Sequence, residues 1–172
     1  MDRKTLMELT TIANTICEKC PGSVLKETDH KDIHEITVAA QSFYEVMKTL
    51  HGDEEFGFDM LTDVVGIDRT PRTPRFDVLY LLLSSKHFTR LSVRLETDEE
   101  QDVPSVSSIW HSANWAEREV FDLLGISFSN HPDLRRILTW ENFEGHPLRK
   151  DFPLEGKDFD KPFDPATIKD YC

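Results

Sequence analysis

The order of apolar and polar residues predicts helices and strands over the first three quarters of the chain. Apolar side chains recur at three- and four-residue intervals, which is the spacing of one helix face, in residues 3–19, 39–50 and 112–124. Shorter apolar runs bounded by turn residues predict strands at residues 33–38, 56–65, 76–83 and 88–95. The order helix, strand, helix, three strands, helix indicates an α+β fold, with a mostly antiparallel sheet and helices packed on one face.

Two of these strands differ in pattern. Residues 76–83 are apolar on both faces, which predicts a strand inside the sheet. Residues 88–95 alternate, with Leu91, Val93 and Leu95 expected to face inward. The intervening residues 84–87 are expected to join these two strands as a hairpin.

The stretch 131–172 has no usable period and predicts an extended, irregular C-terminal tail. It contains five of the nine prolines, each of which removes a backbone donor: Pro132, Pro147, Pro153, Pro162 and Pro165. Its charged clusters alternate with apolar side chains, so it is too apolar for a solvated disordered tail. Ordering the backbone costs about 1–2 kcal/mol per residue, which burial of the apolar side chains must offset. We therefore divide the chain into an α+β domain at 1–130 and a partner-binding tail at 131–172.

The helix predicted at 112–124 carries a misplaced charge. Ser112 or Asn114 can cap its start and Gly125 its end, while Glu117 falls within the apolar arc. Breaking a buried ion pair costs about 3–5 kcal/mol, so Glu117 is expected to meet a cation or several donors. Alternatively, with Asn114 as N-cap, Glu117 forms a capping box and bonds back to the backbone. Its neighbours are expected to point elsewhere: Arg118, Glu119 and Asp122.

The charge and hydropathy of the chain limit the kinds of partner and the cellular location that can be expected for it. The formal net charge is −12, which argues against nucleic acid as the main partner. No apolar stretch approaches the length of a membrane span, and no signal or transit peptide is recognisable. The chain is expected to be made and kept in a cytoplasm-like compartment without spanning the membrane. The acidic run at 96–102 is interpreted as a solvated loop.

Signals of a free-standing enzyme are weak. Neither a phosphate-binding loop nor a dinucleotide-binding fingerprint is present. The seven histidines are scattered, and structural hydrogen bonding is expected for His131 and His146. The arginines of the turn 69–75 could contact an anion or a partner, but such a turn is more often only solvated.

Cys17 and Cys20 form a C-x-x-C pair, but no second pair completes a zinc site, and Cys172 does not make a disulfide framework. We interpret the thiols as incidental. A free-standing thiol redox or zinc protein that uses Cys17 and Cys20 remains the alternative of another class.

Several clusters together resemble a known family. They are Glu117-Arg118-Glu119, Asp122-Leu123-Leu124, His131, Arg135-Arg136-Ile137-Leu138, and the segment Gly145-His-Pro-Leu-Arg-Lys-Asp-Phe-Pro153. In this order, with 76–83 and 103–106 before them, they are similar to the C subunit of respiratory complex I, which is the thirty-kilodalton subunit of NADH:quinone oxidoreductase. The resemblance covers roughly residues 33–160. Phe121 and Leu124 stand where relatives often have Tyr and an aromatic residue, which affects packing alone.

The resemblance implies a non-catalytic structural and assembly subunit. It implies no iron–sulfur cluster, flavin or quinone site in this chain, whereas NADH, quinone, FMN and iron–sulfur clusters belong to the implied proton-translocating complex. The implied partners are the hydrogenase-large-subunit-like subunit, onto which the tail crosses, and an adjacent iron–sulfur subunit. The implied location is peripheral, on the cytoplasmic side of the bacterial inner membrane. An equivalent subunit of an energy-converting hydrogenase, or of a ferredoxin- or coenzyme F420-dependent relative, is the nearest alternative.

The resemblance and the tail pattern together give an expected partner interface and ion network. Its residues are Glu117, Arg118, Glu119, Asp122, His131, Arg135, Arg136, Trp140, Phe143, His146, Arg149, Lys150, Asp151 and Phe152. The arginines are expected to lock the helix to the start of the tail, and the aromatic residues to anchor the interface. Arg149→Ala is therefore expected to weaken assembly while hardly changing thermal stability.

Overall fold

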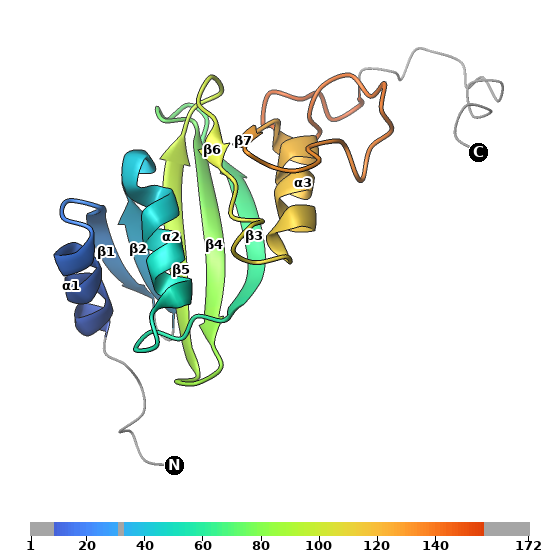
Figure 1. Cartoon of the computed structure of the whole chain (residues 1–172). Coiled ribbons are helices and arrows are strands. Elements are labelled where there is room, and N and C mark those ends of the chain that lie inside the picture. The colour runs from blue at the N-terminus through green and yellow to red at the C-terminus, as the bar shows by residue number, and fades with distance from the viewer. Residues whose placement is uncertain (1–8, 31–32, 157–172) are drawn as a thin grey trace.

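The computed structural model describes residues 9–30 and 33–156 (Figure 1). The first turns of the helix predicted from residue 3, the last part of the predicted tail and Cys172 lie outside the described residues. In the described part, no helix has the length and apolarity needed to cross a membrane.

The core of the fold is a five-stranded sheet with the order β1-β2-β5-β4-β3. The strands are β1 Val24–His30, β2 Ile33–Val38, β3 Met60–Asp68, β4 Phe76–Ser84 and β5 Thr89–Thr97. Neighbours pair antiparallel except β2 and β5, which are parallel. The predicted α+β fold with a mostly antiparallel sheet is therefore confirmed. β4 lies inside the sheet, and the predicted hairpin joins it to β5.

The sequence pattern did not reveal β1. This strand reads VLKETDH, and it lies at the edge of the sheet, where it pairs with β2. An edge strand with mostly exposed side chains lacks the apolar alternation by which strands are recognised. The third strand also begins later than predicted, at Met60, because Phe56 and Phe58 enter the core from the preceding loop.

The helices are α1 Leu9–Lys19, α2 Phe43–Gly52, which follows a short 3₁₀ turn Ala40–Ser42, and α3 Ala113–Leu124. Figure 1 shows α1 and α2 in front of the sheet and α3 beside β3. The Phe43 ring of α2 lies 4.8 Å from the Tyr80 ring of β4. A Cβ added to Gly66 of β3 would lie 2.3 Å from a Leu124 methyl of α3. Gly66 pairs with Val78, two residues from Tyr80, so α2 and α3 pack on the same face.

A second, two-stranded sheet is formed by the segments just before and just after α3. β6 Val103–Pro104 and β7 Phe128–Ser129 pair in parallel, one before α3 and one after it. Val103 and Phe128 are buried, so this small sheet is part of the core. It holds the loop that enters α3 next to the chain that leaves it.

Candidate interface site around helix α3

Glu117 is fully buried and is held by the loop that precedes α3. The Ser105 hydroxyl donates to one carboxylate oxygen at 2.6 Å, and the Val106 N–H donates to the other at 2.8 Å. The capping-box interpretation is wrong, because α3 begins at Ala113 and Glu117 points across to the loop that follows β6 rather than back along the helix. Several donors were the expected alternative to a cation, and the structure supplies them.

No cation compensates Glu117 within the described residues. The nearest ring nitrogen, His131 Nε2, lies 3.9 Å from the carboxylate and donates instead to the Asn114 carbonyl at 3.0 Å. His131 Nδ1 accepts from the Asp133 N–H at 3.1 Å, so the two bonds fit a neutral ring with its proton on Nε2. Burial therefore raises the pKa of Glu117 to about 7, which the two hydrogen bonds only partly oppose.

Asp122 is the main anchor of the tail, although the helical pattern placed it away from the apolar arc. Its carboxylate accepts the N–H groups of Ile137, Leu138 and Thr139 at 3.0, 2.8 and 2.8 Å. The Thr139 hydroxyl and the Arg136 guanidinium, at 2.7 Å, also donate to it. Burial alone would raise the pKa of Asp122, but these bonds hold it well below its usual value. Asp122 is fully buried because the tail folds back over this flank of α3.

The tail also covers the C-terminal end of α3. The Asp122 carbonyl accepts from His146 Nδ1 at 2.8 Å, and the Leu124 carbonyl accepts from Arg149 Nε at 2.6 Å. These groups satisfy carbonyls that have no partner inside the helix, and the Arg149 charge complements the helix dipole. Gly125 ends the helix with φ 72°, as predicted. A Cβ there would lie 2.5 Å from the His146 ring, so the tail approaches where only glycine leaves room.

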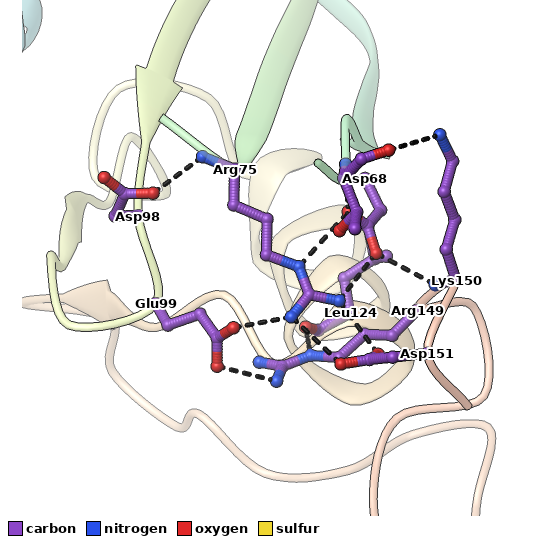
Figure 2. A network of polar contacts seen from close by, with 9 residues as sticks. Asp68, Arg75, Asp98, Glu99, Leu124, Arg149, Lys150 and Asp151 are labelled. Atoms are coloured by element: carbon purple, nitrogen blue, oxygen red, sulfur yellow. Dashed lines mark hydrogen bonds and ion pairs between the residues drawn. The ribbon is translucent and has the colours of Figure 1, made fainter. Parts of the chain in front are cut away.

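A second network ties the tail to the sheet. Figure 2 shows the Arg75 guanidinium among three carboxylates. It bonds to Asp68 and Asp151 at 2.8 and 2.9 Å and to Glu99 at 2.5 Å. The Arg75 N–H also donates to Asp98 at 2.6 Å. Asp68 comes from β3, Glu99 from the loop after β5 and Asp151 from the tail, so one guanidinium joins three separate segments.

Two neighbouring tail residues complete this network (Figure 2). Arg149 bonds to Glu99 at 3.0 Å, and the Lys150 N–H donates to Asp68 at 2.9 Å. Burial opposes ionisation of Asp68, but the bonds from Arg75, Thr70 and Lys150 hold its pKa well below its usual value. Arg149 thus contacts its own domain at two points, and the expectation that Arg149→Ala leaves thermal stability nearly unchanged no longer follows.

Sequence reasoning missed the domain side of this network. In the sequence, the only feature near Asp68 and Arg75 was an arginine-rich turn, which gave no indication of their contact with the tail. Glu99 belonged to an acidic run that was interpreted as solvated. The charged cluster at 149–151 was the one visible sign that acceptors lie opposite.

The remaining residues of the expected network lie nearer to solvent. Arg118 donates to the carbonyls of Arg135 and Arg136 at 3.1 and 3.2 Å. Arg135 pairs with exposed Asp133, and Glu119 is exposed.

The predicted aromatic anchors are grouped in the tail. The Phe143 ring lies 4.8 Å from the Trp140 ring and 5.8 Å from the Phe152 ring. The Arg136 guanidinium lies over the Phe143 ring at 5.8 Å.

Several large apolar side chains of α3 and the tail point outward. We call them the tail surface: Trp115, Leu138, Trp140 and Leu148, which are 68%, 62%, 50% and 60% exposed. The same segment satisfies its buried polar groups within the chain and leaves its apolar groups in solvent. Such an arrangement suits binding to another protein.

The C-x-x-C pair lies far along the chain from this site. Cys17 is exposed and Cys20 half-buried, both free, at the end of α1. Cys20 packs against the core.

Comparisons with known proteins agree with one another. A family model described as "Respiratory-chain NADH dehydrogenase, 30 Kd subunit" matches residues 36–158. The chain is 50% identical to the C subunit of NADH-quinone oxidoreductase from Paramagnetospirillum magneticum, over 86% of this chain and 75% of the relative. It is 46% identical to the protein of the same name from Hyphomonas neptunium, over 91% and 76%.

Among solved structures, the fold matches one chain of the membrane-bound sulfane sulfur reductase, an archaeal respiratory membrane complex. The TM-score is 0.70, with 20% sequence identity, and the match covers 94% of this chain and 89% of the other. At this identity the likeness concerns the fold alone.

Proposed function

The chain belongs to the family of 30 kDa subunits of the respiratory-chain NADH dehydrogenase, and from this premise we propose that it is a non-catalytic docking subunit. In this proposal it forms part of the hydrophilic arm of a proton-translocating NADH:quinone oxidoreductase, peripheral on the cytoplasmic side of the membrane. It has no iron–sulfur cluster, flavin or quinone site of its own. NADH is proposed as donor because the relatives at 46–50% identity are named for it.

One observation supports docking above all. The tail is held to its own domain by buried ionic contacts at Asp122 and Asp68, while the tail surface stays in solvent. Exposed ion pairs contribute only about 0–1 kcal/mol, whereas these contacts are largely withdrawn from water. The described part of the tail, residues 131–156, is thus held against its own domain without a partner, which lowers the entropic cost of binding.

The proposed occupant of the tail surface is the hydrogenase-large-subunit-like protein of the complex, with an iron–sulfur protein next to it. Trp140 and Trp115 are the residue type most enriched at energetically dominant contacts. Aliphatic Leu138 and Leu148 beside them favour an apolar partner surface.

The test replaces the native chain with tagged variants and measures the co-purifying subunits after mild solubilisation of membranes. Leu138→Asp and Leu148→Asp each place a charge on the tail surface and are expected to reduce partner recovery roughly tenfold or more, as loss of an interface anchor does. The matched control is Leu25→Asp, because Leu25 is 65% exposed but lies on β1. Equal recovery with tail variants and control would refute docking through this surface.

The same purification decides the alternatives. A flavin-bearing NADH-oxidising subunit in the wild-type sample supports NADH as donor, and its consistent absence favours the hydrogenase, ferredoxin or F420 relatives. Recovery of the chain alone with stoichiometric zinc would instead support the thiol protein built on Cys17 and Cys20.

A further inference from the structure

Two glutamates of the tail are held beside the tail surface by the backbone around them. The Phe143 N–H donates to the Trp140 carbonyl at 3.0 Å, which closes a tight turn with Glu141 inside it. Arg136 donates at 3.0 Å to the carbonyls of the residues before and after Glu144. Both glutamates are exposed, as is half of Trp140. Their carboxylates therefore stand in solvent at fixed points of the chain, next to an exposed aromatic side chain.

The cations of α3 and the tail are already engaged within the chain. Three of them pair with carboxylates and two donate to backbone carbonyls, in this order: Arg136 with Asp122, Arg135 with Asp133, Arg149 with Glu99, and then Arg118 and Lys150. The two that bind carbonyls are directed elsewhere, Arg118 over the Trp115 ring at 5.9 Å and Lys150 to the Thr70 carbonyl at 3.3 Å.

Glu141 and Glu144 differ from the other charged groups of this segment. Asp133 and Asp151 are also exposed, but each has an arginine partner, at 2.9 Å in both cases. Within residues 9–30 and 33–156, no cation is paired with the carboxylate of Glu141 or Glu144. The turn that displays Trp140 thus carries two negative charges that its own chain does not balance.

This charge distribution selects the occupant of the tail surface. A partner that covers Trp140 comes up against both glutamates, and a carboxylate withdrawn from water without a cation is strongly unfavourable. Like charges placed opposite one another at an interface also oppose binding. A second copy docking through the same surface would set glutamates against glutamates, and an anionic membrane would be repelled. A protein surface with cations beside its apolar groups is favoured.

We propose that the protein that covers the tail surface presents Lys or Arg side chains opposite Glu141 and Glu144, around an apolar patch that receives Trp140. The inference rests on the proposed function, since it supposes docking through the tail surface. It goes further because it states the charge of the partner surface, which the apolar side chains alone do not determine.

The test measures partner recovery from membranes with double variants of the full chain. Glu141→Gln with Glu144→Gln removes the two charges, and Glu141→Lys with Glu144→Lys reverses them. The matched control is Glu18→Lys with Glu27→Lys, which changes the net charge equally at exposed positions of α1 and β1. β1 lies at the sheet edge opposite β3, next to which α3 packs. Leu148→Asp reports on docking through the tail surface itself.

Recovery at about 0.1 M salt, where charges act over about 10 Å, is expected to fall several-fold with the glutamine variant and roughly tenfold or more with the lysine variant. The control should match wild type. At about 1 M salt the difference between the variants and wild type should narrow, because screening shortens that distance to about 3 Å. Urea unfolding of the purified variants should also match wild type, since neither carboxylate has a partner to lose.

The inference is overturned if the lysine variant recovers the partner as well as wild type, or better, while Leu148→Asp loses it; docking through the tail surface then stands. An equal loss with the control would overturn it too, because net charge and not the local surface would be responsible. A lowered unfolding midpoint of the lysine variant would assign the glutamates to the fold instead. If Leu148→Asp also leaves recovery unchanged, the proposed function fails together with the inference.

Discussion

Glu117→Gln is the most informative single substitution, because it removes a buried charge that no cation of the described residues balances. Glutamine keeps the shape of the side chain and an oxygen that accepts the Val106 N–H. The Ser105 hydroxyl lies 2.8 Å from Ser107 Oγ, so it can turn to donate there and accept from the new amide. The substitution therefore removes the charge while leaving the hydrogen-bonding partners satisfied.

The magnitude follows from the difference in pKa between the two states. The pKa of Glu117 rises from an ordinary 4.5 to about 7 in the folded chain. Below pH 4.5 the group is protonated in both states and contributes nothing. As pH rises towards 7, the unfolded state loses the proton first, so the folded state is destabilised. Above pH 7 the whole penalty remains, about 3 kcal/mol from 1.36 kcal/mol per pKa unit.

The assay is urea unfolding of the purified full chain, wild type and Glu117→Gln, between about pH 5 and pH 8. The variant is expected to gain about 2.5 kcal/mol of stability relative to wild type on going from pH 5 to pH 8. Glu119→Gln, on the exposed side of the same helix, is the control and should show a flat difference. A flat difference for Glu117→Gln would refute the reasoning and mean that the carboxylate is ionised throughout.

Three further substitutions test how the tail is held. Asp122→Asn should cost about 2–4 kcal/mol in urea unfolding near pH 7. Because the folded pKa of Asp122 is depressed, its stabilising contribution is complete above the ordinary value and is lost on acidification, so this cost should shrink below about pH 4. Gly125→Ala should lower the free energy of unfolding clearly more than Gly22→Ala. Both glycines have φ above 70°, but only Gly125 of the two has side-chain atoms within 4 Å of the added Cβ. Equal losses of stability would contradict the close approach of the tail. Asp68→Asn should accelerate amide hydrogen exchange at Lys150, whose N–H it accepts.

The sheet and helices were accessible from sequence because their signals are local. Apolar periodicity predicted the three helices and the strands β2, β4 and β5, and Gly125 marked the end of α3 by its need for positive φ. β1 could not be found, because an edge strand satisfies its hydrogen bonds on one side and keeps polar side chains outward. Apolar periodicity in a sequence reflects which side chains are buried, and few side chains of β1 are buried.

The contacts around α3 were less accessible because they depend on which segments meet. The helical pattern placed Asp122 away from the apolar arc but could not show that it is buried, since the pattern contains no information about a tail that returns to the helix. The acceptors of the tail charges, Asp68 and Glu99, lie 82 and 50 residues away from their partners in sequence. Glu117 was recognised as anomalous, and of the two alternatives for it the capping box is wrong and several donors are found, but the sequence did not identify Ser105 and Val106 as those donors. A sequence can thus show that a charge needs a partner without showing where the partner lies.

The distribution of polar and apolar groups in the tail explains how an irregular segment can form part of an interface. With little regular secondary structure, residues 131–156 cannot satisfy their backbone groups by repetition, so buried side chains must do so. Asp122 accepts three successive N–H groups and Arg136 donates to the carbonyls of Phe143 and Gly145, so two charged side chains replace a hydrogen-bond ladder. Because the polar groups are bound inward, the apolar side chains of the tail surface are left outward. The ionic contacts that fix the tail therefore also create the surface that a partner would bury.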